Sequence, residues 1–341
     1  MPELPEVEHF RQVLLPLVSN EQPLHVTLIS KSPPKKFPSV DEWACLGNNN
    51  CFVQSVERKG KLICMHISRR CDASDGTSLN NCAGGQYYLF LHMGMTGRIC
   101  TSNARQLSLE TSKKKSSEDT SPDPFPPPHA HFLFRVGSYE ASFSDPRKFG
   151  SVKLCESMEK AFDELAHDAL ICPLDHFKEK VIGQTKQIKT MLLDQRYVVS
   201  GVGNWVADEC LYQSAIHPNQ TNLTEDEVDR IYSALQSILE VSMQCIEEGV
   251  DFPTNWMFHC RWSKGKGCMK DSNGRIVSFV SSGGRTSAIV ASIQKKSARK
   301  KGETSQKADT IVEPEDTSSR NGTSSSASGL ATRRSKRQKK A

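Results

Sequence analysis

The first residues of the chain bring together two groups that can do chemistry. The sequence opens Met1-Pro2-Glu3, and proline is small enough at the second position for the initiator methionine to be removed. Removal would expose a secondary amine that titrates at about pH 8, so part of it is unprotonated at neutral pH, unlike a lysine amine. Glu3 beside it can move protons. These residues predict a nucleophile with an acid/base partner, although Pro and Glu are also ordinary residues at a helix start.

Four internal segments combine glycine with cationic or apolar residues that could contact a ligand. They are Arg58-Lys59-Gly60-Lys61, His92-Met93-Gly94-Met95-Thr96-Gly97, Asp145-Pro146-Arg147-Lys148-Phe149-Gly150 and Gly201-Val202-Gly203-Asn204-Trp205-Val206-Ala207. Asn204 follows a glycine-rich turn at a predicted helix N-terminus, which is a natural anion site. Each segment alone has a plainer interpretation: a solvated lysine, a helix-capping asparagine, or a Met or Phe in the core.

Taken together and in this order, the opening Met1 to Val7 and the four segments resemble the formamidopyrimidine-DNA glycosylase (Fpg/Nei) family, over roughly residues 2–296. The resemblance is to a eukaryotic, plant-like member. It implies a bifunctional DNA glycosylase and AP lyase of base excision repair. Its partner would be damaged double-stranded DNA, from which it would excise oxidised or ring-opened purines such as 8-oxoguanine and formamidopyrimidines. We expect a monomer without cofactor or membrane association.

The resemblance assigns the chemistry and the phosphate contacts to five residues. Pro2 would attack the sugar C1′ and form an imine that permits strand cleavage by elimination, while Glu3 would move protons. Lys61, Asn204 and Arg285 would clamp the phosphates that flank the lesion.

The residues expected to handle the bases are Met95, Arg147 and Phe149. Met95 would fill the space left by the flipped base, Arg147 would face the orphaned partner base, and Phe149 would wedge the stack. Two other positions stay open. His129, which begins a His-x-His strand start with His131, either contacts phosphate or is an ordinary strand histidine. Glu6 either orders water or the lesion, or is a surface charge that complements the helix dipole.

The last hairpin departs from the family pattern. Most bacterial members hold it with four zinc-binding cysteines, and the aligned positions here are Cys268, Asp271, Val290 and Ile293. Because Val and Ile cannot bind zinc, we predict a metal-free finger in which apolar residues pack where the metal would sit. The segment from Val250 to about Lys266 is also shorter than the bacterial segment that covers the flipped base. The preference among oxidised guanine, ring-opened purines and oxidised pyrimidines therefore stays open.

The surrounding pattern predicts an α+β protein of two domains and a tail. Residues 2–155 are expected to form an antiparallel β-sandwich with a leading helix, whose apolar face is Val7, Phe10, Leu14 and Leu17. A Ser/Lys/Pro-rich stretch near 103–128 is expected to be a disordered loop. Residues 156–296 are expected to form a helical helix-two-turn-helix domain with a zincless-finger hairpin at 276–280 and 286–290. Its clearest helix runs from the capping box at Thr224 to Gly249.

The distribution of charge and the use of cysteine limit the class of protein further. Residues 295–341 hold 13 Lys and Arg against 5 Asp and Glu, which leaves 31 basic and 34 acidic residues in the rest of the chain. We therefore expect a local cationic patch on the folded part and an unfolded basic tail at 297–341 that suits nuclear import. A tail stripped of its Lys and Arg that still entered nuclei would contradict this expectation. The twelve cysteines form no CxxC pair and no apolar run approaches a membrane span, which favours a soluble protein in a reducing compartment.

Two other functions compete with the enzyme. A damaged-DNA binding module could keep the phosphate clamp without turnover, although Pro2 and Glu3 would then have no purpose. An RNA-binding protein could use the helix-two-turn-helix segment alone, and it too leaves the first residues unexplained.

Overall fold

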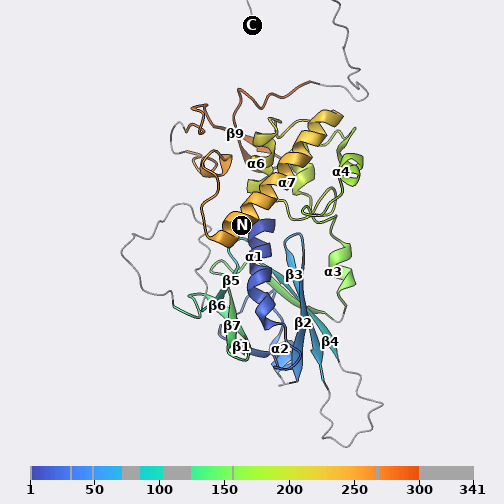
Figure 1. Ribbon diagram of the computed structural model, residues 1–341, viewed down its shortest axis with the longest axis vertical. Helices are drawn as coiled ribbons and strands as arrows, with labels where there is room; N and C mark the ends of the chain where they lie inside the picture. Colours follow the sequence, from blue (N-terminus) through green and yellow to red (C-terminus); the bar gives the residue numbers. More distant parts are fainter. Residues whose placement is uncertain are drawn as a thin grey trace, which may run out of the picture. The chain divides into compact units, whose positions relative to one another are not determined.

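Two antiparallel four-stranded sheets build the N-terminal half of the protein (Figure 1). The computed structural model describes residues 2–30, 33–47, 50–70, 85–102, 124–155, 157–265, 267 and 269–298. One sheet has the order β2 (Cys51–Lys59), β3 (Leu62–Arg69), β4 (Gln86–His92) and β8 (Ser151–Cys155). The other has the order β1 (His25–Leu28), β6 (Ala130–Val136), β7 (Tyr139–Ser144) and β5 (Arg98–Thr101). Apolar side chains of both sheets share one core, as expected of a sandwich.

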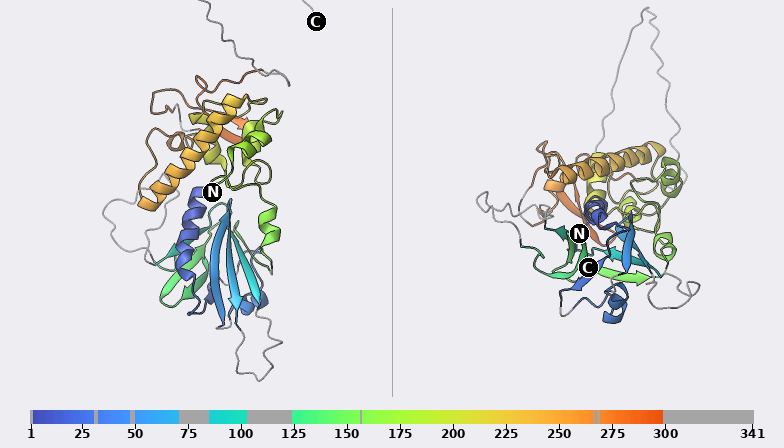
Figure 2. Two further views of the ribbon diagram at one scale, coloured as in Figure 1. Left: turned by 45° about the vertical axis from the view of Figure 1, so that its right-hand side comes forward. Right: turned by 60° about the horizontal axis from the view of Figure 1, so that its bottom comes forward.

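The leading helix α1 (Leu4–Leu14), followed by the 3₁₀ turn η1 (Leu15–Leu17), contacts both sheets and also helix α7 (Figure 2). Val7, Phe10, Leu14 and Leu17 are buried in the sandwich core, which confirms the predicted face. Leu4, one turn earlier, packs instead in the core of the C-terminal helices. One short helix thus ties the first residues of the chain to both cores.

Three elements were not expected from the sequence. Strands β1 and β5 have four residues each and lie at the two edges of their sheet, so they are too short for an alternating pattern to be evident. Helix α2 (Val40–Gly47) did have a signal. The Ser39 N–H donates to Glu42 Oε2 (2.7 Å) and the Glu42 N–H donates to Ser39 Oγ (3.3 Å), a capping box that the sequence displays.

The C-terminal half is helical around a second apolar core. Its helices are α3 (Glu159–Asp163), α4 (Leu174–Val181), α5 (Ile188–Leu193), α6 (Asn204–Gln213), α7 (Glu225–Glu248) and the 3₁₀ turn η3 (Met257–His259). The predicted start and end of α7 are confirmed: Thr224 and Glu227 form the capping box, and Gly249 ends the helix with φ +67°. Helix α6 is buried on nearly all sides and therefore lies inside this core.

The last hairpin consists of β9 (Ser278–Ser282) and β10 (Arg285–Ile289). Its connection is shorter than the 281–285 loop expected from the sequence. Ser282 pairs with Arg285, and the two turn residues between them, Gly283 and Gly284, have φ +54° and +74°. Arg285 therefore belongs to the first pair of the strand.

Several expectations fall outside the described residues, namely those on Met1, 103–123, Cys268 and the tail beyond 298. The end of the expected disordered loop is placed, however. Pro127 is buried and its carbonyl accepts from the Ala130 N–H, while the Pro128 carbonyl accepts from Ser144 Oγ (2.8 Å), so residues 124–128 belong to the fold. Contacts join the described residues into one compact unit. In the part of the chain that the structure describes, no helix is long and apolar enough to cross a membrane.

Candidate active site

The carboxylate of Glu3 lies against the N-terminus of helix α6. Its Oε1 accepts from the Trp205 N–H (2.9 Å) and its Oε2 accepts from the Val206 N–H (3.0 Å), and the residue is only 2% exposed. Both donors belong to the first turn of the helix, where backbone N–H groups have no partner within the helix. The helix end therefore holds the Glu3 side chain in one orientation. Pro2, the neighbouring residue, is also buried.

The turn before α6 is shaped to admit these first residues. The Leu4 N–H donates to the Gly201 carbonyl (3.1 Å), which anchors the chain start to the turn. A Cβ atom added at Gly203 would lie 2.2 Å from Glu3 Cδ, and one at Gly201 would lie 2.6 Å from Leu4 Cδ1. Both glycines are thus required for space. The predicted Asn204 is the first helical residue and Gly203 is the N-cap, so Asn204 is not the capping asparagine of the plainer interpretation.

Glu6 is not a surface charge, because it is only 4% exposed. Its Oε2 accepts from the Glu3 N–H (2.9 Å) and its Oε1 accepts from Trp205 Nε1 (3.0 Å). Burial, with the nearby negative charge of Glu3, raises the pKa of Glu6 to about 7. Both oxygens therefore fix the positions of Glu3 and of helix α6.

Lys61 follows the tight turn between β2 and β3, as predicted, and its Nζ donates to the Val202 carbonyl (2.8 Å). Burial lowers the pKa of Lys61; the Glu3 and Glu6 carboxylates act in the opposite direction, and the positive charge of Arg285 lowers it further. Residues far apart in the sequence thus meet in one electrostatic site. An ammonium group has three donors, so Lys61 keeps donors for an anion beside the Val202 carbonyl.

Asp168, which the sequence analysis missed, positions the turn that carries Lys61. Its carboxylate accepts from Arg58 Nη1 (2.5 Å) and from the Gly60 N–H (2.6 Å). Arg58 Nε in turn donates to Glu8 of α1 (2.8 Å). The sequence indicated only the Arg58-Lys59-Gly60-Lys61 turn and not the residue that positions it, because Asp168 lies in a loop far along the chain.

Asn204 and Arg285 approach the site from helix α6 and strand β10. Asn204 Nδ2 donates to the Thr286 carbonyl (3.3 Å), while its buried Oδ1 has no hydrogen-bond partner among the described residues. Arg285 is exposed. Lys264, a further cation that the sequence analysis did not single out, donates to Thr286 Oγ1 (3.2 Å). Lys264, Arg285 and the amide of Asn204 are therefore grouped around Thr286.

Met95 and Phe149 lie at the tips of two neighbouring loops and are 41% and 48% exposed. Neither is a core residue, which excludes the plainer interpretation. The guanidinium of Arg147 lies 4.9 Å from the centre of the Phe149 ring. The loops touch, since a Cβ at Gly94 would lie 2.4 Å from the carbonyl carbon of Phe149.

The fully buried Asp145 joins these two loops. Its Oδ1 accepts from Thr96 Oγ1 (2.6 Å) and its Oδ2 accepts from the Gly150 N–H (2.7 Å). His131 is buried and its Nε2 lies 3.0 Å from the Asp145 carbonyl, so it is a structural histidine. His129 is exposed just before β6, with φ +64°.

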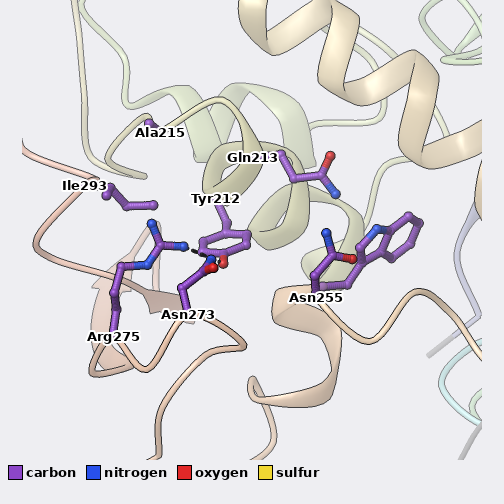
Figure 3. A pocket seen from close by; sticks show the side chains of 8 residues that line it. Tyr212, Gln213, Ala215, Asn255, Asn273, Arg275 and Ile293 are labelled. Carbon is purple, nitrogen blue, oxygen red and sulfur yellow. Dashed lines mark hydrogen bonds between the residues drawn. The ribbon is translucent and has the colours of Figure 1, made fainter.

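Three of the four finger positions aligned with zinc ligands have other roles, namely Asp271, Val290 and Ile293. Val290 is buried and Ile293 is partly buried in an apolar cluster with Met257 and Val277. Asp271 accepts from the Tyr212 hydroxyl (3.0 Å) and from Arg275 Nε (2.7 Å). Figure 3 shows Arg275 directed at Tyr212 beside a cavity of about 430 Å³ at the C-terminal end of α6. Among the described residues, no three His, Cys, Asp or Glu side chains are grouped as metal ligands.

Glu209 of α6 provides a test of the packing beside this site. Its carboxylate accepts from the Phe258 N–H (2.8 Å) and from Gln213 Nε2 (2.9 Å), and burial raises its pKa to about 7. The folded state therefore binds this proton more tightly than the unfolded state, and ionisation destabilises the fold as the pH rises from about 4.5 to above 7. We expect Glu209→Gln to gain stability relative to the wild type between pH 5 and pH 8, on the order of 2–3 kcal/mol.

Denaturant unfolding of both proteins across this range measures the effect. Taking the difference from the wild type cancels the titration of other buried groups, such as His92, whose pKa burial lowers. Glu240→Gln, on the exposed face of α7, is the control and should follow the wild type. A constant difference between Glu209→Gln and the wild type would show that the carboxyl group does not titrate in this window.

Sequence and structure comparisons agree on the class of protein that this fold and site define. The family model of the formamidopyrimidine-DNA glycosylase N-terminal domain matches residues 1–152, and that of the family's H2TH domain matches residues 165–254. A formamidopyrimidine-DNA glycosylase of Arabidopsis thaliana is 30% identical over 304 residues, which cover 86% of this chain and 71% of that protein. One from Deinococcus radiodurans is 29% identical over 273 residues, with 78% and 82% covered. The chain belongs to the formamidopyrimidine-DNA glycosylase family.

Solved structures show the same fold at lower identity. The Lactococcus lactis enzyme, bound non-covalently to DNA containing an AP site, superposes with a TM-score of 0.60 at 21% identity and covers 86% of this chain and 100% of its own. MutM in complex with DNA containing carbocyclic 8-oxo-G gives a TM-score of 0.60 at 22% identity, with the same coverage. The predicted architecture, a β-sandwich followed by a helix-two-turn-helix domain, is confirmed.

Proposed function

We propose that this protein is a bifunctional DNA glycosylase and AP lyase that excises oxidised or ring-opened purines from duplex DNA. The observation that carries the proposal is the buried carboxylate of Glu3, the residue after Pro2, which two backbone N–H groups of α6 hold in place. A carboxylate held in this way is pre-organised for proton transfer at a neighbouring reacting group. The relatives named above are glycosylases for formamidopyrimidine, which gives the substrate class.

In the proposed reaction, the chain first loses Met1. The free nitrogen of Pro2 then forms a bond to the sugar C1′ while the glycosidic bond breaks and the damaged base leaves with the bonding electrons. Glu3 takes up the proton that the Pro2 nitrogen loses on forming this bond and passes it to the ring oxygen, so that the ring opens and an iminium links Pro2 to C1′. The iminium acidifies C2′, and loss of a C2′ proton expels the 3′ phosphate and cuts the strand.

Contacts with the DNA follow from charge and exposure. Lys61, Asn204 and Arg285 are proposed to bind the phosphates next to the lesion. Lys61 interacts electrostatically with both Glu3 and Arg285, and Asn204 directly precedes the Trp205 N–H that binds Glu3. Met95 and Phe149 are proposed to enter the duplex, since their exposed apolar surface can replace the stacking lost when the base flips. We propose that the protein acts as a monomer and that its finger needs no metal.

Borohydride trapping on an abasic duplex tests the enzymatic function. The wild type is expected to give a covalent adduct, and mass spectrometry is expected to locate it on Pro2 of a chain without Met1. Pro2→Gly should abolish or sharply weaken the adduct. A wild type that binds the duplex without forming an adduct would be a damaged-DNA binding module, and an adduct on a lysine would exclude the proposed nucleophile. Preference for RNA over duplex DNA in competition would favour the RNA-binding alternative.

A further inference from the structure

A buried ionic cluster connects helices α5 and α6 with the segment before the finger. Asp208 of α6 accepts from Lys189 Nζ of α5 (2.5 Å) and from Arg261 Nη2 (3.0 Å). The side chains of Lys189, Asp208 and Arg261 are 0%, 2% and 5% exposed. One carboxylate therefore compensates two buried cations, and Lys189 depends on it, because burial lowers its pKa while Asp208 raises it.

The cluster reaches the strand that carries Arg285. Lys189 Nζ donates to Ser287 Oγ (2.6 Å) and to the Thr286 carbonyl (3.3 Å), and Asp208 Oδ2 accepts from the Ala288 N–H (3.4 Å). Three consecutive residues of β10 are thus held from α5 and α6. Arg285 is the residue directly before them.

The Thr286 carbonyl is shared with the phosphate clamp. It accepts from Asn204 Nδ2 (3.3 Å) as well as from Lys189 Nζ. Asn204 and Asp208 lie one turn apart on α6, so the helix presents an amide and a carboxylate to the same short length of strand. The orientation of the Asn204 amide, and with it the direction of its Oδ1, is therefore coupled to Lys189.

We propose that Asp208 is a positioning residue for DNA binding. It fixes strand β10 on α6 so that Arg285 and Asn204 contact the same row of DNA phosphates. The inference rests on the proposed function, because it names the role of a residue behind the same site. The cluster acts only through the strand and the amide, since Asp208 is buried beneath them.

The physical basis is the imbalance left when the carboxylate is neutralised. Asn in place of Asp208 would leave two buried cations close together with no carboxylate bonded to either of them. Lys189 would then lose its proton or withdraw, and its bonds to Thr286 and Ser287 would break. Arg285 would remain on the surface but no longer in a defined position, so its phosphate contact would weaken while the distant wedge loops stay unchanged.

The test is the coupling between Asp208→Asn and Arg285→Ala in binding to a duplex with a stable abasic-site analogue. In the wild type, Arg285→Ala is expected to weaken binding roughly tenfold and to reduce the slope of log K against log salt by about one. Asp208→Asn alone should do nearly the same. Adding Arg285→Ala to Asp208→Asn should then change little, because the arginine has already lost its contact.

Asp271→Asn is the matched control. It makes the same change at a buried carboxylate of the finger that also bonds to α6. Its partner on the helix is Tyr212, at the C-terminal end, so Arg285→Ala should keep its full effect in that background. Melting temperatures of all variants separate general destabilisation from positioning. If Asp208→Asn does not fold, Ser287→Ala removes only the bond to Lys189 and should still reduce the effect of Arg285→Ala.

The positioning role would be overturned if Arg285→Ala weakened binding by the same factor in the wild type, in Asp208→Asn and in Asp271→Asn. It would also be overturned if the binding losses of the variants simply followed their melting temperatures. A wild type that neither binds the abasic-analogue duplex nor forms the borohydride adduct would instead contradict the proposed function. The two failures are therefore distinguishable.

Discussion

Glu3→Gln is expected to lower the rate of base excision by about 10²- to 10⁴-fold, because a carboxamide cannot transfer the proton. The structure adds a second cost. Both Glu3 oxygens accept hydrogen bonds from backbone N–H groups of α6. In glutamine an NH₂ group replaces one of these oxygens, so one backbone N–H would face a donor and lose its hydrogen bond. Single-turnover excision on a duplex with one oxidised purine measures the effect, and binding to the abasic-analogue duplex shows whether the clamp survives.

Glu21→Gln is the control for the same chemical change outside the site, because Glu21 is exposed in the connection before β1. It should excise at the wild-type rate. Excision by Glu3→Gln within a few-fold of the wild type would exclude Glu3 as the acid/base group. A proportional loss of folded protein in Glu3→Gln would instead assign its effect to the helix contact alone.

Gly203→Ala is expected to be the second most damaging substitution, although it adds a single methyl group. Gly203 has an extended backbone (φ −120°, ψ −161°) that alanine adopts without strain, so the conflict is one of space. The new Cβ would lie 2.2 Å from Glu3 Cδ. Overpacking costs about 1–3 kcal/mol, and the Glu3 carboxylate must move to make room for the methyl group. Because a displaced carboxylate is out of place for proton transfer, excision should fall more than 100-fold, within the range expected for Glu3→Gln.

Gly183→Ala separates this effect from the general cost of replacing a glycine. Gly183 has φ +72° with nothing within 4 Å of the added Cβ, so the substitution brings backbone strain without a clash. It should destabilise the fold by about 1 kcal/mol and leave excision by the folded protein unchanged. Equal excision by Gly203→Ala and the wild type would show that the turn can move away from Glu3 at little cost.

The carboxylates behind the site form a pattern that extends beyond these two tests. Asp168 fixes the turn with Lys61, Asp145 joins the two wedge loops, and Asp208 holds the strand after Arg285. All three are buried and accept hydrogen bonds from cationic side chains, hydroxyls or backbone N–H groups. Each of the segments proposed to contact DNA is therefore fixed by an acid that would not itself touch the DNA.

Local signals in the sequence determined much of this protein. The capping box at Thr224 and the left-handed Gly249 bounded α7, and the apolar spacing of α1 predicted its buried face, because these features depend on neighbours within one or two turns. The site motifs were also visible, since each combines its glycines and its functional side chain within a few residues. The short edge strands β1 and β5 were missed because four residues carry too little pattern. The finger turn was predicted too long because Ser281, Ser282 and Arg285 are polar and were assigned to the loop.

Only the tertiary structure decided how these motifs meet. Glu3 finds its donors at Trp205 and Val206, some two hundred residues along the chain, and the burial that raises the pKa of Glu6 exists only once both cores have formed. Asp208 carries no local sign that it would hold strand β10. A buried charge takes its partners from whichever elements pack around it, and that packing is a property of the whole fold, which no short stretch of sequence contains.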